Sequence, residues 1–138
     1  ATLPLADISK RVGLSVTPCW NRIRKMEENG IIVGRQTLID RSKVNLPIVV
    51  FLSLTVSGHT ENWVEKFVKT IESYDEIVEV HRLTGASADY VLKIVAESVK
   101  DYDDFQQQLI QQLDFTKMSS SISLQELKQT SSVPLNKI

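Results

Sequence analysis

Residues 13–32, GLSVTPCWNRIRKMEENGII, combine the signals of a short helix with an unusual distribution of charge. Ser15 can cap a helix by accepting a backbone N–H bond, and Pro18 is tolerated in a first turn, where no internal N–H bond is lost. At about 100° per residue, one narrow sector of this helix is apolar. That sector contains Val16, Cys19, Ile23 and Met26. We therefore expect an amphipathic helix over residues 16–29 that ends at Gly30.

The opposite side of this helix is cationic near its N-terminus, where the helix dipole favours acids. Most polar helix faces are simply solvated. Cationic and amide side chains, however, are the groups that contact phosphates and base edges. The preceding segment, 4–12, has the apolar spacing of another helix and stops at Gly13, so the pattern is that of a helix-turn-helix. The predicted DNA-binding residues are Ser15, Thr17, Pro18, Trp20, Asn21, Arg22, Arg24 and Lys25, of which Thr17, Asn21 and Arg24 are placed to read base edges.

Charge separates the chain into two parts. The 138 residues have a net charge of −1, but residues 1–45 contain eight Lys/Arg against four Asp/Glu, and residues 46–138 contain eight against thirteen. Blocks of opposite sign suggest a polyanion-binding part joined to one that does not bind polyanions, although two solvated surfaces would give the same count. We predict a DNA-binding domain with linker over 1–45 and a second domain with a C-terminal tail over 46–138.

The pattern after Gly30 predicts the rest of the fold. Residues 31–39 are β-rich around Gly34, which suits a small wing hairpin, and 40–46 form a polar connection. Strict alternation from Ile48 to Val56 indicates a strand with one buried face. The remaining predicted elements are a helix at 61–73, strands at 76–83 and 88–97, a helix set by Tyr102, Phe105, Leu109 and Leu113, and a strand at 118–128. This βαββαβ order is ferredoxin-like, with both helices on one face of an antiparallel sheet, so the fold class is α+β.

The second face of that sheet would be uncovered in a single chain. Val49 and Phe51 point to it if the alternation holds. An apolar patch of this kind predicts contact with another subunit.

The two halves together resemble the Lrp/AsnC family, named for the leucine-responsive and asparagine-synthesis regulators. The first half has the family's motifs at Val12-Gly13-Leu14-Ser15, Thr17-Pro18-Cys19, Arg22-Ile23, Glu27 and Gly30-Ile31-Ile32. The second half matches at Gly85, at Asp89 to Ile94 and in the ending ELKQTSSVPL over 126–135. The resemblance implies a winged helix-turn-helix, truncated because the family's first helix is missing, followed by an effector-sensing and oligomerising domain.

The resemblance also implies the function. Family members are sequence-specific, DNA-binding transcription regulators of the bacterial or archaeal cytoplasm, associated with the nucleoid. They bind double-stranded DNA and a small molecule, typically an amino acid, and they form homodimers that assemble up to octamers. In the family, the effector site lies between dimers at the turn that here contains Gly85, Ala86, Ser87, Asp89 and Tyr90. This chain departs from the family by one extra residue between Gly85 and Asp89, so Asp89 is equally well interpreted as a turn-capping residue.

Other chemistry has little support in the sequence. No apolar run reaches the roughly 20 residues that span a membrane. Cys19 is the single cysteine, and His59 and His81, expected in a loop and a strand, lack metal-ligand company. We expect no enzyme activity, cofactor or metal. The alternative to a transcription regulator is a non-DNA-binding effector or oligomerisation module that regulates a metabolic enzyme, and the basic helix favours the regulator.

Overall fold

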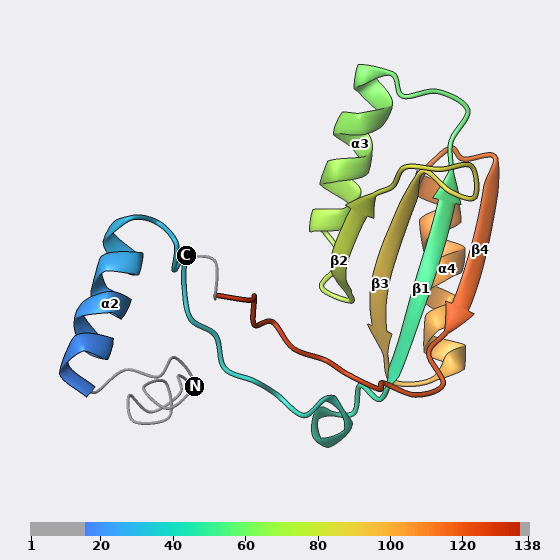
Figure 1. The fold of residues 1–138 in the computed structure, drawn as a ribbon. Coiled ribbons are helices and arrows are strands. Elements are labelled where there is room, and N and C mark those ends of the chain that lie inside the picture. Colours follow the sequence, from blue (N-terminus) through green and yellow to red (C-terminus); the bar gives the residue numbers. More distant parts are fainter. Residues whose placement is uncertain (1–15, 136–138) are drawn as a thin grey trace. The chain divides into compact units, whose positions relative to one another are not determined.

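The computed structural model describes residues 16–135, which belong to two compact units. The first unit ends at Asp40 and the second begins at Arg41, so residues 41–45, assigned to the first domain in the prediction, group with the second unit. The helix expected over 4–12 and the capping residue Ser15 lie outside the described residues. Figure 1 gives the arrangement of the elements within each unit.

Helix α2 (Val16–Glu28) confirms the predicted amphipathic helix. Cys19, Ile23 and Met26 form one buried cluster, with Ile32 packed against it. The helix ends as expected at Gly30, which adopts a φ of +76°, and Ile31 N–H then donates to Met26 O at 2.7 Å. A left-handed residue after a helix is the conformation that glycine adopts at least cost.

The wing hairpin expected over 31–39 is not formed. Among the described residues, those from Val33 to Asp40 contain no strand, although the segment is exposed and rich in β-branched and apolar residues. The two arms on either side of Gly34 would be short, and an isolated two-stranded hairpin is marginal in water. Within residues 16–135 no strand pairs with this segment and its residues are exposed, so its β propensity does not decide its structure.

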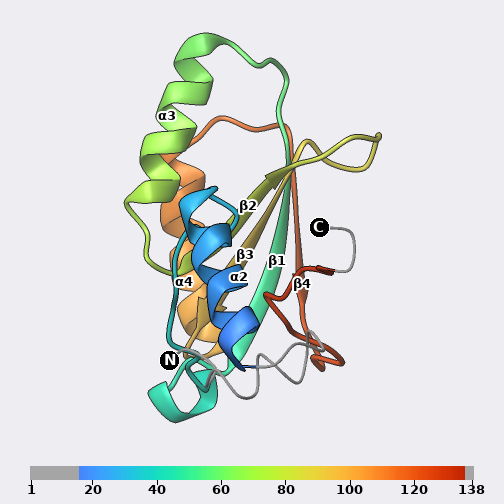
Figure 2. The same cartoon turned by 60° about the vertical axis from the view of Figure 1, so that its left-hand side comes forward.

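The second unit has the predicted βαββαβ order, preceded by the short 3₁₀ helix η1 (Arg41–Val44). Its elements are β1 (Ile48–Thr55), α3 (Glu61–Glu72), β2 (Ile77–Arg82), β3 (Tyr90–Ala96), α4 (Val99–Gln112) and β4 (Lys117–Ile122). The sheet order is β2-β3-β1-β4, and every neighbouring pair is antiparallel. Both helices lie on the same side of the sheet (Figure 2). The ferredoxin-like prediction is confirmed.

Local capping fixes where the two helices of this unit begin. The Thr60 hydroxyl accepts from the Trp63 N–H at 3.2 Å, and the Ser98 hydroxyl accepts from the Asp101 N–H at 3.1 Å. Glu61 and Asp101 place acids in the first turns, where they complement the helix dipole. Asp101 therefore has a helix-terminal role, because its backbone N–H is capped by Ser98 and its carboxylate lies in the first turn of α4.

The core lies between the helices and the sheet. Alternate residues of the two central strands point to it and are fully buried: Val50, Leu52 and Leu54 from β1, with Leu92 and Ile94 from β3. The helices contribute Phe67 from α3, and Tyr102, Phe105 and Leu109 from α4. The predicted helical stripes thus meet the predicted strand face, which is what gives the second unit its single core.

The last strand is shorter than the sequence suggested, because it ends at Ile122 rather than near residue 128. Its partner β1 begins at Ile48, and in the antiparallel register Ile122 already pairs with Val50. The Ser123 N–H still donates to Val49 O at 2.8 Å, and the chain then leaves the sheet. Glu126 in the following segment forms an ion pair with Arg41 of η1, so this segment lies against the start of the unit.

Candidate DNA-binding helix and effector turn

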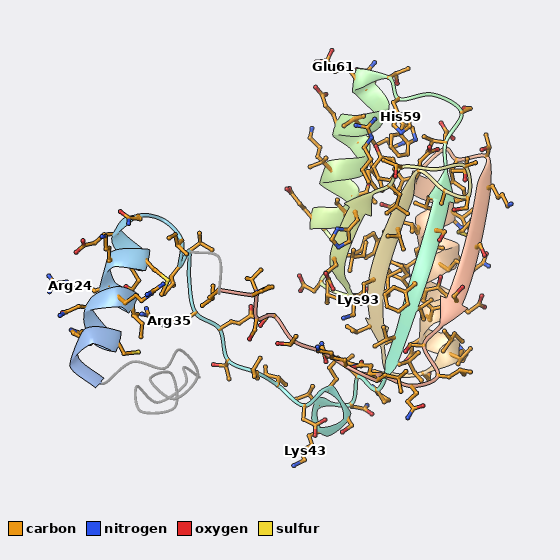
Figure 3. The ribbon with its side chains drawn as sticks, in the orientation of Figure 1. Arg24, Arg35, Lys43, His59, Glu61 and Lys93 are labelled. Atoms are coloured by element: carbon orange, nitrogen blue, oxygen red, sulfur yellow. The ribbon has the colours of Figure 1, made fainter. Side chains whose placement is uncertain are left out.

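The polar side of α2 is exposed, as a recognition helix requires. Asn21, Arg22, Arg24 and Lys25 are exposed, and Trp20 is 53% exposed, which is unusual for so large an aromatic residue. Figure 3 shows Arg24 projecting from the helix. Thr17 and Pro18 belong to the first turns of α2, but their side chains are not among those described. The predicted residues whose side chains are described, Trp20, Asn21, Arg22, Arg24 and Lys25, are thus exposed on one helix, away from the buried Cys19 cluster.

The distribution of acidic residues along α2 differs from that along the other helices. α2 has no acid in its first turn, whereas α3 and α4 each have one. Its acids come later: Glu28 pairs with Arg24 at 3.5 Å, with both side chains largely exposed, and Glu27 pairs with Arg35. Arg35 was not singled out from the sequence, because it follows the helix in a segment that was expected to be a wing. The ion pair with Glu27 holds this additional cation beside α2.

The predicted effector turn joins β2 to β3. Gly85 at its tip has a φ of +105°, a conformation that side-chain-bearing residues rarely adopt. Gly85, Ala86 and Ser87 are exposed, whereas Ala88 is buried. At the base of the turn the Leu83 N–H donates to Asp89 O at 2.8 Å. The tip is therefore the part of the turn that a ligand can reach from solvent.

Asp89 has a structural partner. Its Oδ2 accepts from the Val56 N–H at 2.8 Å, and its own N–H donates to Leu54 O at 2.8 Å. Together these bonds fasten the beginning of β3 to the end of β1. The half-buried carboxylate thus has the turn-anchoring role that the sequence analysis kept as an alternative to ligand binding.

Tyr90 points into an aromatic cluster that the sequence analysis did not identify. Its ring centroid lies 4.7 Å from Phe67, 5.6 Å from Trp63 and 5.5 Å from His59. The Trp63 indole N–H donates to Asp114 O at 2.6 Å, which ties the start of α3 to the segment after α4. Among the predicted effector residues, Tyr90 and Asp89 therefore stabilise the turn from beneath, and the exposed tip is formed by the other three.

The open face of the sheet, opposite the helices, is mixed in character. Phe51 is 41% exposed there, between Lys93 of β3 and Ser121 of β4 in the strand register. Val49, expected to be exposed on the same face, is instead buried beside Val95, near the point where the segment after β4 bonds to β1. The exposed part of this face is thus centred on Phe51 rather than on both predicted residues.

Within residues 16–135, no group of three or more His, Cys, Asp or Glu side chains is arranged to hold a metal ion. Over the same residues, no helix is long and apolar enough to cross a membrane. Cys19 is 1% exposed and belongs to the core of the first unit. His59 and His81 lie in a loop and in β2 respectively, as predicted.

Two family profiles match the chain. Residues 49–133 match the Lrp/AsnC ligand binding domain, and residues 1–33 match a winged helix-turn-helix DNA-binding domain. The first match extends over most of the second unit. The second match includes α2 and ends where the chain emerges from the Gly30 turn.

Curated relatives are similar over nearly their whole length. The HTH-type transcriptional regulator Zrp of Zymomonas mobilis is 41% identical, with 100% of this chain and 90% of that protein aligned. The glutamate uptake regulatory protein of the same species is 36% identical, with 98% and 82% aligned. Both are named as regulators, which favours the regulator interpretation over a non-DNA-binding module.

Solved structures agree with the fold. An AsnC family transcriptional regulator from Agrobacterium tumefaciens is 38% identical, with a TM-score of 0.84 over 99% of this chain and 89% of that one. A transcriptional regulator from Neisseria meningitidis in complex with L-Met is 28% identical, with a TM-score of 0.83 over 98% and 87%. With its helix-turn-helix profile, its ligand-binding domain and these relatives, the chain belongs to the Lrp/AsnC family of DNA-binding transcription regulators.

Proposed function

We propose that α2 is the recognition helix of this regulator, with Asn21 and Arg24 at base edges together with Thr17. The observation that carries the proposal is the division of α2 into a buried side and an exposed cationic side without acids in the first turn. The remaining predicted residues, Ser15, Pro18, Trp20, Arg22 and Lys25, then position the helix on the duplex. Arg35, held beside the helix by Glu27, adds a phosphate contact.

Selection from a random pool of DNA duplexes tests this proposal without knowledge of the target promoter. The chain should enrich a defined sequence, and its affinity should fall steeply as salt rises, because Lys and Arg contacts to phosphates release counterions. Enrichment of no sequence, together with weak and salt-insensitive binding, would favour an effector module that does not bind DNA. Such a regulator works in the cytoplasm of its cell, at the nucleoid.

The tip of the β2–β3 turn is the proposed effector site. Gly85, Ala86 and Ser87 are exposed, and backbone N–H groups of such a turn can bind the carboxylate of an amino acid, while Asp89 with Tyr90 hold the turn in place. Asp89 Oδ2 already accepts from Val56, so only its second oxygen is left for a ligand ammonium. An amino acid is the proposed class of effector because the N. meningitidis relative was solved with L-Met.

Calorimetry with the standard amino acids, L-Met first, tests this site. Gly85→Ala should weaken binding of the active amino acid about tenfold or more, because the added Cβ strains a residue at φ +105° although the space around it is open. Gly58→Ala is the matched control, since its surroundings are also open and its φ lies outside that strained region. Equal weakening by both substitutions, or by neither, would place the effector elsewhere.

The open sheet face is the proposed dimer interface, and dimers are proposed to assemble further, up to octamers. Phe51 supplies an apolar centre, and Glu79 and Lys93 bring both signs of charge to the same face, which suits a self-complementary contact between two copies. Phe51→Glu should convert the dimer to a monomer in sedimentation experiments at micromolar concentration. Val68→Glu is the control, because Val68 is 42% exposed but lies on α3 in the helical layer. An unchanged dimer in Phe51→Glu would exclude this face.

A further inference from the structure

Three charged or titratable side chains form a connected group on the open sheet face. His81 Nε2 lies 3.3 Å from Glu79 Oε1, and Lys93 Nζ lies 3.5 Å from Glu79 Oε2. Glu79 pairs with Lys93 across β2 and β3, and Lys93 in turn pairs with Phe51 of β1, so the group shares a face with Phe51. We call these three side chains the His81 group.

We propose that the His81 group makes association of two copies of this chain through the open sheet face sensitive to protons, so that the dimer weakens as the pH falls below neutral. This inference rests on the proposed dimer interface. It adds pH dependence to the dimer, and a dimer through this face could equally form without any pH dependence.

The net charge of the group depends on whether His81 carries a proton. With a neutral imidazole, Glu79 and Lys93 cancel, so burial of the group against a second copy brings no excess charge. When His81 accepts a proton, each copy carries one excess positive charge, and a dimer brings two of them together in a desolvated contact. An unpaired buried charge is strongly unfavourable. Proton binding should therefore favour the separated chains.

Glu79 stays ionised over the range in which histidine ordinarily changes charge. The hydrogen bond with His81 lowers the pKa of the Glu79 carboxyl, burial opposes this, and Lys93 lowers the pKa further. β2 is an edge strand with β3 as its neighbour, and Val91 is the residue opposite His81. Among the described residues, the charged groups nearest His81 on this face are Glu79 and Lys93, and Lys117 lies farther across the sheet on β4.

Sedimentation equilibrium of the chain at about pH 7.5 and about pH 5.5 measures the effect. Each histidine changes the dimer dissociation constant by at most about tenfold per pH unit, and a dimer has two copies of His81. The dissociation constant should therefore rise about tenfold or more on acidification. His81→Gln should remove most of this response. His59→Gln is the matched control, because the other histidine of the chain lies in the loop before α3 and should leave the response intact (Figure 3).

The Lys93→Met substitution should reverse the direction in which dimerisation depends on pH. Without the lysine, the group has an unpaired Glu79 at neutral pH and a compensated His81–Glu79 pair in acid. Dimerisation of this variant should therefore strengthen as the pH falls. Circular dichroism at both pH values checks that each variant remains folded.

The outcomes separate this inference from the proposal on which it rests. A wild-type dimer with the same dissociation constant at both pH values would overturn the proton response and leave the dimer interface standing. The proton response would also be overturned if the His81→Gln dimer weakened in acid as much as the wild type does. The same holds if the Lys93→Met dimer weakened, rather than strengthened, as the pH falls. Absence of a dimer at about pH 7.5 would overturn the proposed interface and the inference together.

Discussion

Asp89 Oδ2 and the Val56 backbone N–H are joined at 2.8 Å, across the ends of two neighbouring strands. A carboxylate that caps a strand end in this way leaves the amide unsatisfied if it is removed, and a half-buried unpaired N–H costs about 1–3 kcal/mol. Asp89→Ala should lower the free energy of unfolding by that amount in urea titrations. Asp89→Asn keeps an acceptor oxygen and should cost less. Equal losses in both variants would mean that the negative charge, rather than the hydrogen bond, is what matters.

Tyr102 provides a pH-dependent prediction. Its hydroxyl lies 2.6 Å from the Ser120 hydroxyl, and burial raises the pKa of the phenol above its usual value, against an opposing effect of Ser120. The unfolded phenol ionises near pH 10, before the folded one, so the unfolded state gains stability as the pH rises above about 10. Tyr102→Phe should cost about 1 kcal/mol near neutral pH. The difference from wild type should shrink above about pH 10, and a constant difference in denaturant titrations would contradict this account.

The two tryptophans allow DNA contact to be observed directly. Trp63 belongs to the aromatic cluster of the second unit, and Trp20 is exposed on α2. In a Trp63→Phe variant, Trp20 is the single indole, and its emission should change when DNA is added, because the predicted contact surface surrounds it. The converse variant, Trp20→Phe, keeps the half-buried Trp63 of the second unit and should respond much less. A response from Trp63 alone would place the DNA away from α2.

Local patterns determine most of the fold. The alternation from Ile48 to Val56 predicted both β1 and its buried face, since a strand exposes alternate residues to the same neighbour. The apolar sector of α2 predicted the burial of Cys19, Ile23 and Met26 for the same kind of reason. On α2 the polar residues of the candidate site follow from the same periodicity, because the side opposite a buried sector must be exposed.

Contacts between distant residues explain what the sequence left open. Asp89 and Val56 are 33 residues apart, and Trp63 and Asp114 are 51 apart, so no spacing rule connects them. The sequence analysis was wrong about the wing hairpin over 31–39 and about exposure of Val49 for the same reason. Whether a segment forms a strand, or a side chain is buried, depends on which other residues pack against it and not only on its own composition. For the same reason Asp89 had two interpretations from sequence alone, and its partner Val56 is found only in the folded chain.

The ion pair between Arg24 and Glu28 allows the most direct test of the central claim, that the exposed side of α2 binds DNA. The measurement is fluorescence anisotropy with the duplex that the wild-type chain selects. Arg24→Ala should weaken binding by about 1–3 kcal/mol, roughly 5- to 150-fold, while the unfolding free energy changes little. Glu28→Gln removes the same ion pair but releases Arg24, so it should leave affinity unchanged or raise it. Equal affinity of Arg24→Ala and the wild type, or equal losses in the two variants, would contradict the assignment of α2 as the recognition helix.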